Sequence, residues 1–436
     1  MGAETTAGIL EEKIRSHQAR VGIVGLGYVG LPLAVEFARA GFQVTGIDVD
    51  AAKTARVNAG DSYVGDIPSS VLAGLVKEGK LRATTDFAAV RQLDTVNICV
   101  PTPLRKTKDP DMSFIVSSCQ EILNNLHEGM LIILESTTYP GTTDELLLPM
   151  FEKSGLHVGQ DFFLCFSPER VDPGNPKYQT ANIPKVVGGT TAACTAMGEL
   201  FYSQALASVV PVSSTQVAEM VKLLENTFRM INIGLVNEMA LMCDRMGINV
   251  WEVIEAAATK PFGFMPFYPG PGLGGHCIPI DPFYLSWKTK QAGIEARFIE
   301  LAGYINGQMP HFVVDKIQNA LNDAGKPVKG SHIHILGVAY KKDIEDLRES
   351  PALDVMLLLK RRGARLSYSD PHVPRLRLED IELQAQPEAV AGEADCTAII
   401  TDHSSFDYRR IVESARLIVD TRNALKGVNS AHIVRL

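Results

Sequence analysis

The sequence has no cysteine framework, no excess of positive charge and no long hydrophobic run. Its seven cysteines are odd in number, scattered and free of CxxC spacing, which argues against disulfides or a zinc site and favours reduced thiols in a cytoplasmic protein. We therefore expect no metal. The formal net charge of −8 gives the chain no overall attraction to nucleic acid or anionic lipid. No apolar run reaches the roughly 18 residues of a membrane span, and Glu11 and Glu12 follow the first apolar pair, unlike a signal peptide.

The rest of the composition is that of an ordinary globular chain. Of its 436 residues, 46% are hydrophobic and 21% are charged, which excludes a disordered, collagen-like or coiled-coil protein. At roughly 100–200 residues per domain, this length predicts two to four domains. Because the whole chain is acidic, the positive charge that would bind an anionic ligand must be local.

A glycine motif follows the first apolar strand. Residues 20–50 hold a strand at 21–24, the pattern Gly25-x-Gly27-x-x-Gly30, a helical stretch and a second strand that ends at Asp48. The three glycines respectively allow a tight turn, the approach of a pyrophosphate and close packing of helix on strand. The helix N-terminus offers N–H groups to the phosphates. Asp48 can bind the adenosine ribose and would repel a 2′-phosphate, which favours NAD over NADP; a glycine-rich turn without a ligand is the alternative.

Two later strands carry hydroxyl residues at their carboxyl ends. The strands are expected at 95–100 and 131–135, and Pro101-Thr102-Pro103 and Ser136-Thr137-Thr138 follow them. Ligands of an open parallel sheet sit outside the carboxyl ends of its strands. Thr102 and Thr137 are therefore candidate contacts of the cofactor or the substrate, with helix capping as the alternative.

Residues 332–436 repeat this organisation without the glycines. Strands are expected at 333–338, at 364–368 before Asp370, at 397–401 and at 417–420. A loop with Lys341, Lys342 and Arg348 suits a phosphate that side chains bind, and Arg422 follows another strand. A solvated run of charge is the alternative. The predicted fold class is α/β, with two nucleotide-binding-like halves.

One long helical pattern, residues 213–247, lies between the halves. At about 1.5 Å per residue it gives a rod of roughly 50 Å, long enough to bridge two domains or to pair with its copy in a dimer. Lys222 and Asn226 are four residues apart and therefore share a face. Lys222 either extends along an apolar surface to water or points into a cleft.

The segment PGPGLGGHCIPIDPFYLSW, residues 269–287, suggests a reactive cysteine. Its glycines lead Cys277 to the expected start of a helix, because Pro279 suits a first turn. A helix N-terminus lowers the pKa of a thiol, and Asp281 would lie on the same face. We interpret the adjacent His276 as structural. An inert core thiol is the alternative reading of Cys277.

A nucleophilic cysteine beside a nicotinamide has a specific chemical use. Oxidation of an alcohol to an acid takes two hydride transfers, and the intermediate aldehyde needs a nucleophile before it can give up the second hydride. A thiolate forms a thiohemiacetal and then a thioester, which water hydrolyses. A buried lysine would stabilise the developing oxyanion, and a carboxylate would handle protons.

These residues together resemble the UDP-glucose/GDP-mannose dehydrogenase family of nucleotide-sugar 6-dehydrogenases. The resemblance is carried, over nearly the whole chain from about residue 20, by GLGYVGLPLA, SPER, EMVKLLENTFR, GPGLGGHCIPIDPFYL, GVAYKKD and DTRN. It implies an NAD-binding Rossmann-like domain, a central helical dimerisation region and a UDP-binding Rossmann-like domain. It also implies oxidation of a UDP-hexose at C6 to the uronate with two NAD+ and one water. We place these parts at 20–210, 211–325 and 326–436, after an N-terminal extension at 1–19.

The resemblance implies a role for each matching residue. Cys277 resembles the nucleophile, Lys222 the oxyanion-stabilising cation with Asn226 beside it, and Asp281 the carboxylate that holds the hydrolytic water. Glu169 resembles a base that acts through water, and Thr137 a hydroxyl at the reaction centre. The cofactor residues are expected to be Gly25, Gly27, Tyr28, Val29, Gly30, Asp48, Lys53, Pro101, Thr102, Thr137 and Arg348. The substrate residues are expected to be Glu169, Arg170, Lys222, Asn226, Gly274, Lys341 and Arg422.

One departure bears on the substrate. Family members that act on UDP-glucose usually carry a second glutamate just before a glycine, where this chain has Pro173 before Gly174. The motif SPER…DPGN is similar to that of the family branch that acts on UDP-N-acetylhexosamines. We rank UDP-N-acetylglucosamine (UDP-GlcNAc) first, then the N-acetylgalactosamine or N-acetylmannosamine compounds (UDP-GalNAc, UDP-ManNAc), then UDP-glucose, with the product feeding a surface polysaccharide.

Two other classes remain open at this point. A two-electron hydroxy-acid dehydrogenase shares the glycine motif and the long helix, but needs neither Cys277 nor the C-terminal half. A non-catalytic nucleotide-sugar binder would not need Lys222, Cys277 and Asp281 together. We expect a homodimer or higher homo-oligomer, with no nucleic acid or membrane partner.

Overall fold

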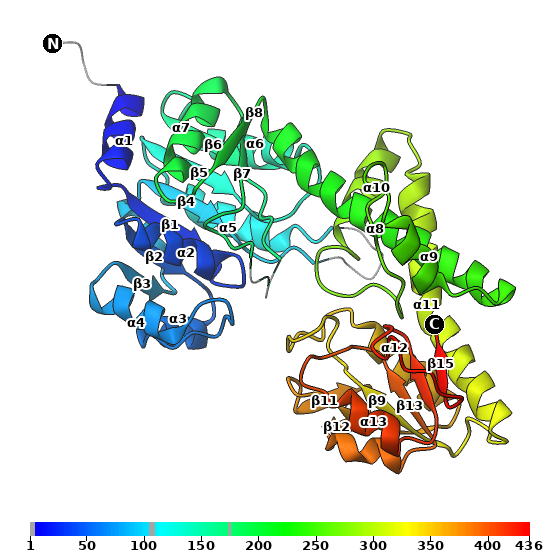
Figure 1. The fold of residues 1–436 in the computed structure, drawn as a ribbon. Helices are drawn as coiled ribbons and strands as arrows, with labels where there is room; N and C mark the ends of the chain where they lie inside the picture. The colour runs from blue at the N-terminus through cyan, green and yellow to red at the C-terminus, as the bar shows by residue number, and fades with distance from the viewer. Residues whose placement is uncertain (1–4, 104–109, 173–174, 176) are drawn as a thin grey trace. The chain divides into compact units, whose positions relative to one another are not determined.

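The computed structural model describes residues 5–103, 110–172, 175 and 177–436, and it divides into two compact units. Unit 1 ends at Glu225 and unit 2 begins at Asn226. Helix α8 (Thr215–Met246) continues along the chain from unit 1 into unit 2. Each unit is built around one sheet (Figure 1). No helix among the described residues is long and apolar enough to cross a membrane.

Unit 1 holds an eight-stranded sheet in the order β3-β2-β1-β4-β5-β6-β7-β8. Its first six strands have the 3-2-1-4-5-6 order of a dinucleotide-binding fold, and the pair β6–β7 alone is antiparallel. The strands are β1 (Arg20–Val24), β2 (Gln43–Ile47), β3 (Leu81–Thr84), β4 (Thr95–Ile98), β5 (Met130–Leu134), β6 (Phe162–Phe166), β7 (Lys185–Gly189) and β8 (Val209–Val212). The helices are α1 (Thr6–Arg15), α2 (Gly30–Arg39), α3 (Ala51–Asn58), α4 (Ser69–Lys77), α5 (Ser113–Leu123), α6 (Leu148–Phe151) and α7 (Ala192–Ser203), with short turns at η1 (Phe87–Gln92), η2 (Thr143–Leu147) and η3 (Glu152–Ser154).

Unit 2 holds a five-stranded parallel sheet in the order β10-β9-β13-β14-β15, with a separate hairpin of β11 and β12. The strands are β9 (His332–Leu336), β10 (Arg365–Ser369), β11 (Arg375–Leu378), β12 (Ile381–Gln384), β13 (Cys396–Ile399), β14 (Ile418–Asp420) and β15 (Ile433–Arg435). The helices are α9 (Val250–Ala257), α10 (Asp281–Gln291), α11 (Arg297–Asp323), α12 (Pro351–Arg361) and α13 (Tyr408–Ser414), with a turn at η4 (Glu388–Gly392). The prediction of an α/β chain with two Rossmann-like parts joined by a long helix is confirmed.

The apolar cores follow from the alternation of side chains along the strands. In β5, Leu131 and Ile133 belong to one buried cluster, and Met130, Ile132 and Leu134 belong to the other. A strand that is apolar on both faces must be covered on both. The all-apolar runs that the sequence shows are therefore the central strands of a sheet between two layers.

Polar side chains cap the helices that follow some of the strands. Asp50 begins α3 by accepting the N–H of Ala52 at 2.8 Å, and Ser350 begins α12, with Pro351 in its first turn. Such side chains satisfy amides that have no partner within the helix. One expectation is wrong here: α10 begins at Asp281, with Pro282 in its first turn, and not near Cys277.

Candidate functional site

The glycine motif forms the turn between β1 and α2. Gly25 has φ +93°, and a Cβ on it would lie 2.6 Å from the carbonyl oxygen of Cys99. A Cβ on Gly30 would lie 1.8 Å from the carbonyl oxygen of Gly25, so only glycine allows helix and strand this close. Beside Gly27 there is open space. The loop therefore presents bare backbone at the start of α2, where a pyrophosphate fits.

Asp48, directly after β2, is bound to that loop. Its carboxylate is buried, and it accepts the N–H of Leu26 at 2.8 Å and the N–H of Asp50 at 2.9 Å. The ammonium of Lys53 lies 3.8 Å from it, and Tyr28 is exposed on the loop. Asp48 thus fixes the loop, and its contact with an adenosine ribose stays a prediction. Val29 is the residue before the first turn of α2.

The hydroxyl residues lie beyond the carboxyl ends of β4 and β5, which are parallel neighbours. Thr102 is buried, Thr137 is half-buried, and Pro101 is exposed. Ser136 donates from Oγ to the carbonyl oxygen of Val100 at 2.8 Å, which ties the two strand ends together. The expected cofactor residues of unit 1 therefore gather at the carboxyl edge of the sheet.

Glu169 follows β6 at the same edge, and its carboxylate is held on both oxygens. Oε1 accepts the N–H groups of Arg170 at 2.7 Å and Val171 at 2.8 Å, and Oε2 lies 3.3 Å from the ammonium of Lys185. Burial would raise the pKa of Glu169, but Lys185, these two amides and Lys222 more than offset it, so that this pKa lies below its usual range. Glu169 is therefore an ionised acceptor. The guanidinium of Arg170 pairs with Glu225 at 2.6 Å.

The sequence analysis did not identify four connected polar residues next to Glu169, namely Asn97, Glu135, Lys185 and Tyr202. Glu135 receives the ammonium of Lys185 at 2.5 Å and the amide of Asn97 at 3.0 Å, and the Tyr202 hydroxyl also donates to it. A charged or amide residue within an apolar strand, such as Asn97 in β4 or Lys185 at the start of β7, is the signal that could have found them. Such groups are buried only when they are paired.

Helix α8 buries both of its expected site residues. Lys222 is 7% exposed and Asn226 is 9% exposed, one turn further along the helix. The amide of Asn226 donates to Oδ2 of Asp281 at 2.6 Å. The reading of Lys222 as a lysine that extends to water is therefore wrong, because the ammonium would then be exposed.

Cys277 lies in the turn that leads into α10. Its carbonyl oxygen accepts the N–H of Asp281 at 2.8 Å, four residues on. Of the seven cysteines, all within the described ranges, six are buried and Cys277 is half-buried. Burial raises the pKa of Cys119 and of Cys396 to about 12, which makes those thiols inert. Its partial exposure sets Cys277 apart from the six buried cysteines, and its role as a nucleophile stays a prediction.

The reactive segment packs on the charged loop after β9. The N–H of Gly275 donates to the carbonyl oxygen of Arg348 at 3.0 Å, and a Cβ on Gly274 would lie 2.6 Å from Cβ of Tyr340. The half-buried Lys341 lies on the same loop, and Arg348 is exposed and paired with Asp346 at 2.6 Å. Unit 2 therefore brings the cysteine turn and the cationic loop together, which the sequence could not place.

Arg422 lines a hollow of about 310 Å³ within unit 2. Its Nε donates to the carbonyl oxygen of Ile400 at 2.8 Å, and a Cβ on Gly270 would meet its guanidinium at 2.7 Å. The other lining residues are Trp251, Glu255, Tyr268, Pro269, Asp402 and Asn423. Aromatic walls beside a half-buried guanidinium suit the base and phosphate of a nucleotide.

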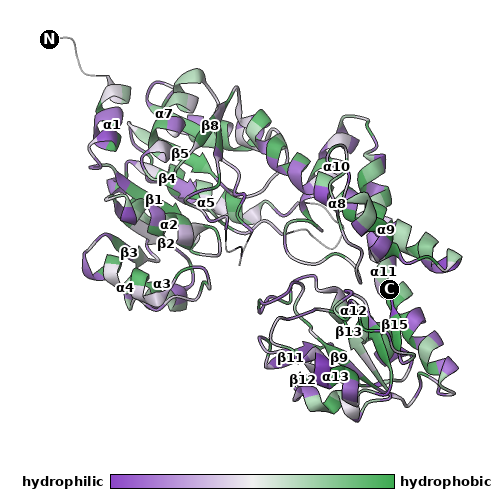
Figure 2. Ribbon diagram, in the orientation of Figure 1, coloured by the Kyte–Doolittle hydropathy of each residue, from purple (hydrophilic) through white to green (hydrophobic). Residues whose placement is uncertain are grey.

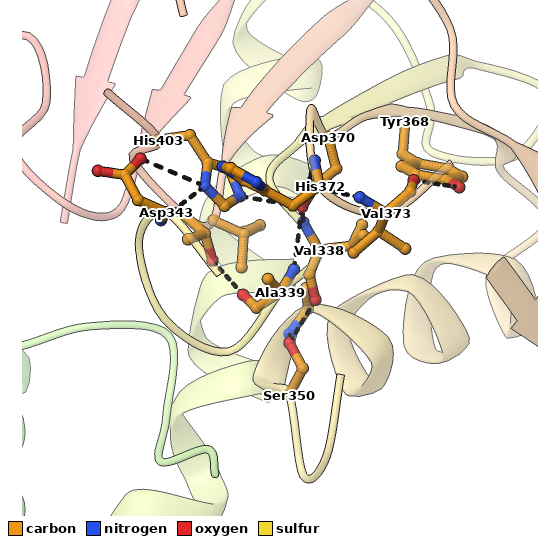
Figure 3. Close-up of polar contacts among 12 residues, drawn as sticks. Val338, Ala339, Asp343, Ser350, Tyr368, Asp370, His372, Val373 and His403 are labelled. Atoms are coloured by element: carbon orange, nitrogen blue, oxygen red, sulfur yellow. Dashed lines mark hydrogen bonds and ion pairs between the residues drawn. The ribbon is translucent and has the colours of Figure 1, made fainter. Parts of the chain in front are cut away.

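A buried histidine binds the cationic loop through hydrogen bonds (Figure 3). His403 is fully buried; its Nε2 lies 3.0 Å from Oδ2 of Asp370, and its Nδ1 accepts the N–H of Asp343 at 2.9 Å. Asp370 also accepts the N–H groups of Val338 and Ala339, as Asp48 accepts that of Leu26. Asp343, His372 and His403 lie close enough for a metal ion, but both nitrogens of His403 are already used. This cluster positions the loop that carries Lys341.

Comparison with known proteins gives a consistent result over most of the chain. Three family models match: the NAD binding domain, the central domain and the UDP binding domain of the UDP-glucose/GDP-mannose dehydrogenase family, at residues 19–206, 216–308 and 334–427. A UDP-N-acetyl-D-mannosamine dehydrogenase of Methanococcus maripaludis is 32% identical over 93% of both chains. A UDP-N-acetyl-D-glucosamine 6-dehydrogenase of Pseudomonas aeruginosa is 35% identical over 81% of this chain and 83% of its own. The solved UDP-D-ManNAc dehydrogenase of Pyrococcus horikoshii has a TM-score of 0.88 and 33% identity, over 95% of this chain and 98% of that one.

Proposed function

The chain belongs to the UDP-glucose/GDP-mannose dehydrogenase family, and we propose that it is the NAD-dependent UDP-GlcNAc 6-dehydrogenase of that family. The observation that supports the reaction type is the pairing in sequence and backbone of Cys277 and Asp281. Cys277 is half-buried, its carbonyl oxygen accepts the N–H of Asp281, and Asn226 orients the buried Asp281 carboxylate. A two-electron dehydrogenase has no use for that pair, and neither does a nucleotide-sugar binder.

The proposed reaction takes the C6 alcohol to the acid in two oxidations. When bound, NAD+ supplies a hydride acceptor for each of them. Glu169 takes the alcohol proton through water, and Cys277 adds to the aldehyde carbon as thiolate to give a thiohemiacetal. Loss of the second hydride leaves a thioester, and water held by Asp281 displaces the Cys277 sulfur to give the uronate. One UDP-sugar, two NAD+ and one water therefore give one uronate, two NADH and three protons.

The other assigned residues bind and orient. Lys222 stabilises the oxyanions that form when the thiolate and later water attack. Thr137 contacts the reacting end of the substrate, and Lys341 and Arg422 bind the UDP phosphates, with Arg170 and Gly274 further along the sugar site. Arg348 reaches the cofactor.

Because Cys277 must stay a reduced thiol, we propose that the enzyme acts in the cytoplasm.

The choice among UDP-N-acetylhexosamines rests on the SPER…DPGN wording and on the P. aeruginosa relative. UDP-ManNAc is the second candidate, because the P. horikoshii structure that the chain resembles is described as an enzyme of that sugar. The test is kcat/KM for UDP-GlcNAc, UDP-ManNAc, UDP-GalNAc and UDP-glucose under one set of conditions. We expect the highest value for UDP-GlcNAc. A higher value for UDP-ManNAc would overturn the substrate and leave the reaction type unchanged.

Asp48 should set the preference for NAD over NADP. Asp48→Asn keeps an acceptor for the Leu26 N–H but removes the charge that repels a 2′-phosphate, so the loop should survive. We expect the ratio of kcat/KM for NAD+ to that for NADP+ to fall roughly tenfold, about 1.4 kcal/mol. The ratio is measured with saturating sugar. An unchanged ratio would place the ribose contact at another residue.

We also propose that the enzyme is a homodimer, formed through an exposed apolar stripe in unit 2. Phe228, Leu235 and Met242 of α8 recur every seven residues and are 46%, 53% and 44% exposed, and Phe298 of α11 is 74% exposed. Figure 2 shows the alternation of hydrophobic and hydrophilic residues along α8. A stripe with this spacing on one long helix can pair with its own copy about a two-fold axis.

Leu235→Glu should dissociate that dimer, because it places a charge at the centre of the stripe. We expect light scattering to give the mass of one chain for this variant at micromolar concentration and of two chains for the unmodified protein. Arg229→Gln, also exposed on α8 but about 100° around the helix from Phe228, is the control and should stay dimeric. A wild-type mass of one chain would contradict the proposal.

A further inference from the structure

The buried residues behind Glu169 form a charged group that the reaction above does not use. Lys185 begins β7, and its side chain is 6% exposed. Its ammonium lies between two carboxylates, at 2.5 Å from Glu135 and 3.3 Å from Glu169. It also lies 5.4 Å from the ring centre of Tyr202. Two carboxylates on one ammonium, all away from water, form an arrangement that is costly unless every group is satisfied.

Glu135 is satisfied on both oxygens. Oε1 accepts the amide of Asn97 at 3.0 Å and the Tyr202 hydroxyl, and Oε2 accepts Lys185. Its side chain is completely buried. The ammonium of Lys185, at the start of β7, is held by Glu135 just after β5 and lies against Tyr202 on α7, and Asn97 on β4 binds both of these residues. Because Glu135 holds the ammonium of Lys185, the position that this ammonium offers to Glu169 is fixed.

The same ammonium also binds Glu169, the proposed base. Glu169 already gives Oε1 to two backbone amides, so Lys185 at Oε2 removes the remaining rotational freedom of the carboxylate. We propose that Lys185 is a positioning residue for catalysis: anchored by Glu135 and Tyr202, both of which Asn97 binds, it pairs with Glu169 and holds that carboxylate in one orientation. This inference rests on the proposed role of Glu169 as the base that acts through water.

Other charged or titratable groups act on Glu169 from each neighbouring element. Lys222 on α8 also favours the ionised form. Glu135 binds the same ammonium as Glu169, and a like charge that close disfavours ionisation. The Cys99 thiol after β4 stays neutral, because burial raises its pKa. The phenol of Tyr202 stays neutral for the same reason. Lys185 is therefore the direct contact among these residues that keeps Glu169 charged.

The predicted effect has a definite sign. Glu169 must be ionised to accept a proton, and Lys185 lowers the pKa of Glu169, so activity is lost as the pH falls through that lowered pKa. Lys185→Met should raise this pKa. The acid limb, meaning the fall of kcat/KM on the acidic side of its pH profile, should therefore move to higher pH by at least one unit. At a pH below the new limb, kcat should fall at least tenfold, with KM for NAD+ unchanged. Lys185→Arg restores the charge and should restore the limb.

A second variant separates positioning from folding. Lys185→Met leaves Glu135 buried without its cation and can fail to fold, whereas Lys185→Met with Glu135→Gln removes both charges and keeps an acceptor for Tyr202 and Asn97. The double variant should fold and still show the raised acid limb. Glu135→Gln alone should not move the limb upward, because it removes only an opposing negative charge. Lys153→Met, at an exposed lysine of the same unit, is the control for loss of a cation.

One readout does not need turnover. Infrared titration of the carboxylate band, taken as the difference between a protein and its Glu169→Gln form, reports the protonation of Glu169 directly. We expect the titration midpoint of Glu169 to rise in the double variant and to stay in place in Lys185→Arg. An unchanged midpoint and an unchanged acid limb in the double variant would overturn the role of Lys185. A raised midpoint with no oxidation of any UDP-sugar by the wild type would instead overturn the proposed function.

Discussion

Replacing Cys277 by serine is expected to abolish net formation of the uronate. A serine hydroxyl is a far weaker nucleophile than a thiolate at neutral pH, so no covalent adduct forms and the aldehyde cannot give up its second hydride. We expect kcat for the acid product to fall by roughly 10⁴-fold or more, a loss typical of a removed nucleophile. Product is measured by chromatography of the nucleotide sugars, and NAD binding should be unchanged because the glycine loop is in unit 1.

Cys243→Ala is the matched control, because it removes a thiol of the same unit that is 2% exposed. It should lower stability slightly and leave the rate within a few-fold of wild type. Acid formation at an unchanged rate by Cys277→Ser would remove Cys277 from the covalent mechanism.

Lys222→Met is expected to have the second-largest effect. The side chain keeps its length and apolar stem but loses the charge that stabilises each oxyanion. Removal of one such preorganised group costs about 10²–10³-fold in kcat, and KM for NAD+ should change little. The rate is measured at the alkaline plateau, where Glu169 stays ionised even without the neighbouring charge of Lys222.

The exposed Lys153→Met serves as the control for loss of a lysine charge. A Lys222→Met enzyme with kcat within threefold of wild type would show that the buried ammonium has only a structural role. A loss in KM for the sugar without a loss in kcat would assign Lys222 to ground-state binding.

Much of the fold follows from local patterns in the sequence. The strand, glycine and acid spacing around Gly25 and Asp48 predicted β1, α2 and β2, because each glycine meets a steric demand that other residues cannot. The expected strands differ from β4, β9 and β13 by one or two residues at their ends. The long helix was expected at 213–247 and is α8, because its caps and apolar spacing are local signals. The division at 210–211 and 325–326 stays a prediction.

The features that the sequence analysis misplaced or missed depend on contacts between residues that are distant in the chain. The start of α10 was placed too early, because Pro279 and Pro282 both suit a first turn, and the helix uses Pro282. The ion pairs of Lys185 join residues 16 to 50 positions apart, which no local pattern reveals. The contact of Gly275 with Arg348 likewise follows from tertiary packing alone.

The central claim is a four-electron oxidation, and the number of NADH molecules formed per sugar tests it most directly. A limiting, weighed amount of UDP-GlcNAc is run to completion with excess NAD+, and NADH is read by its absorbance while the remaining sugar is measured by chromatography. We predict two NADH for each sugar consumed, with the uronate as the product. One NADH per sugar would contradict the thioester mechanism and the role of Cys277 in it.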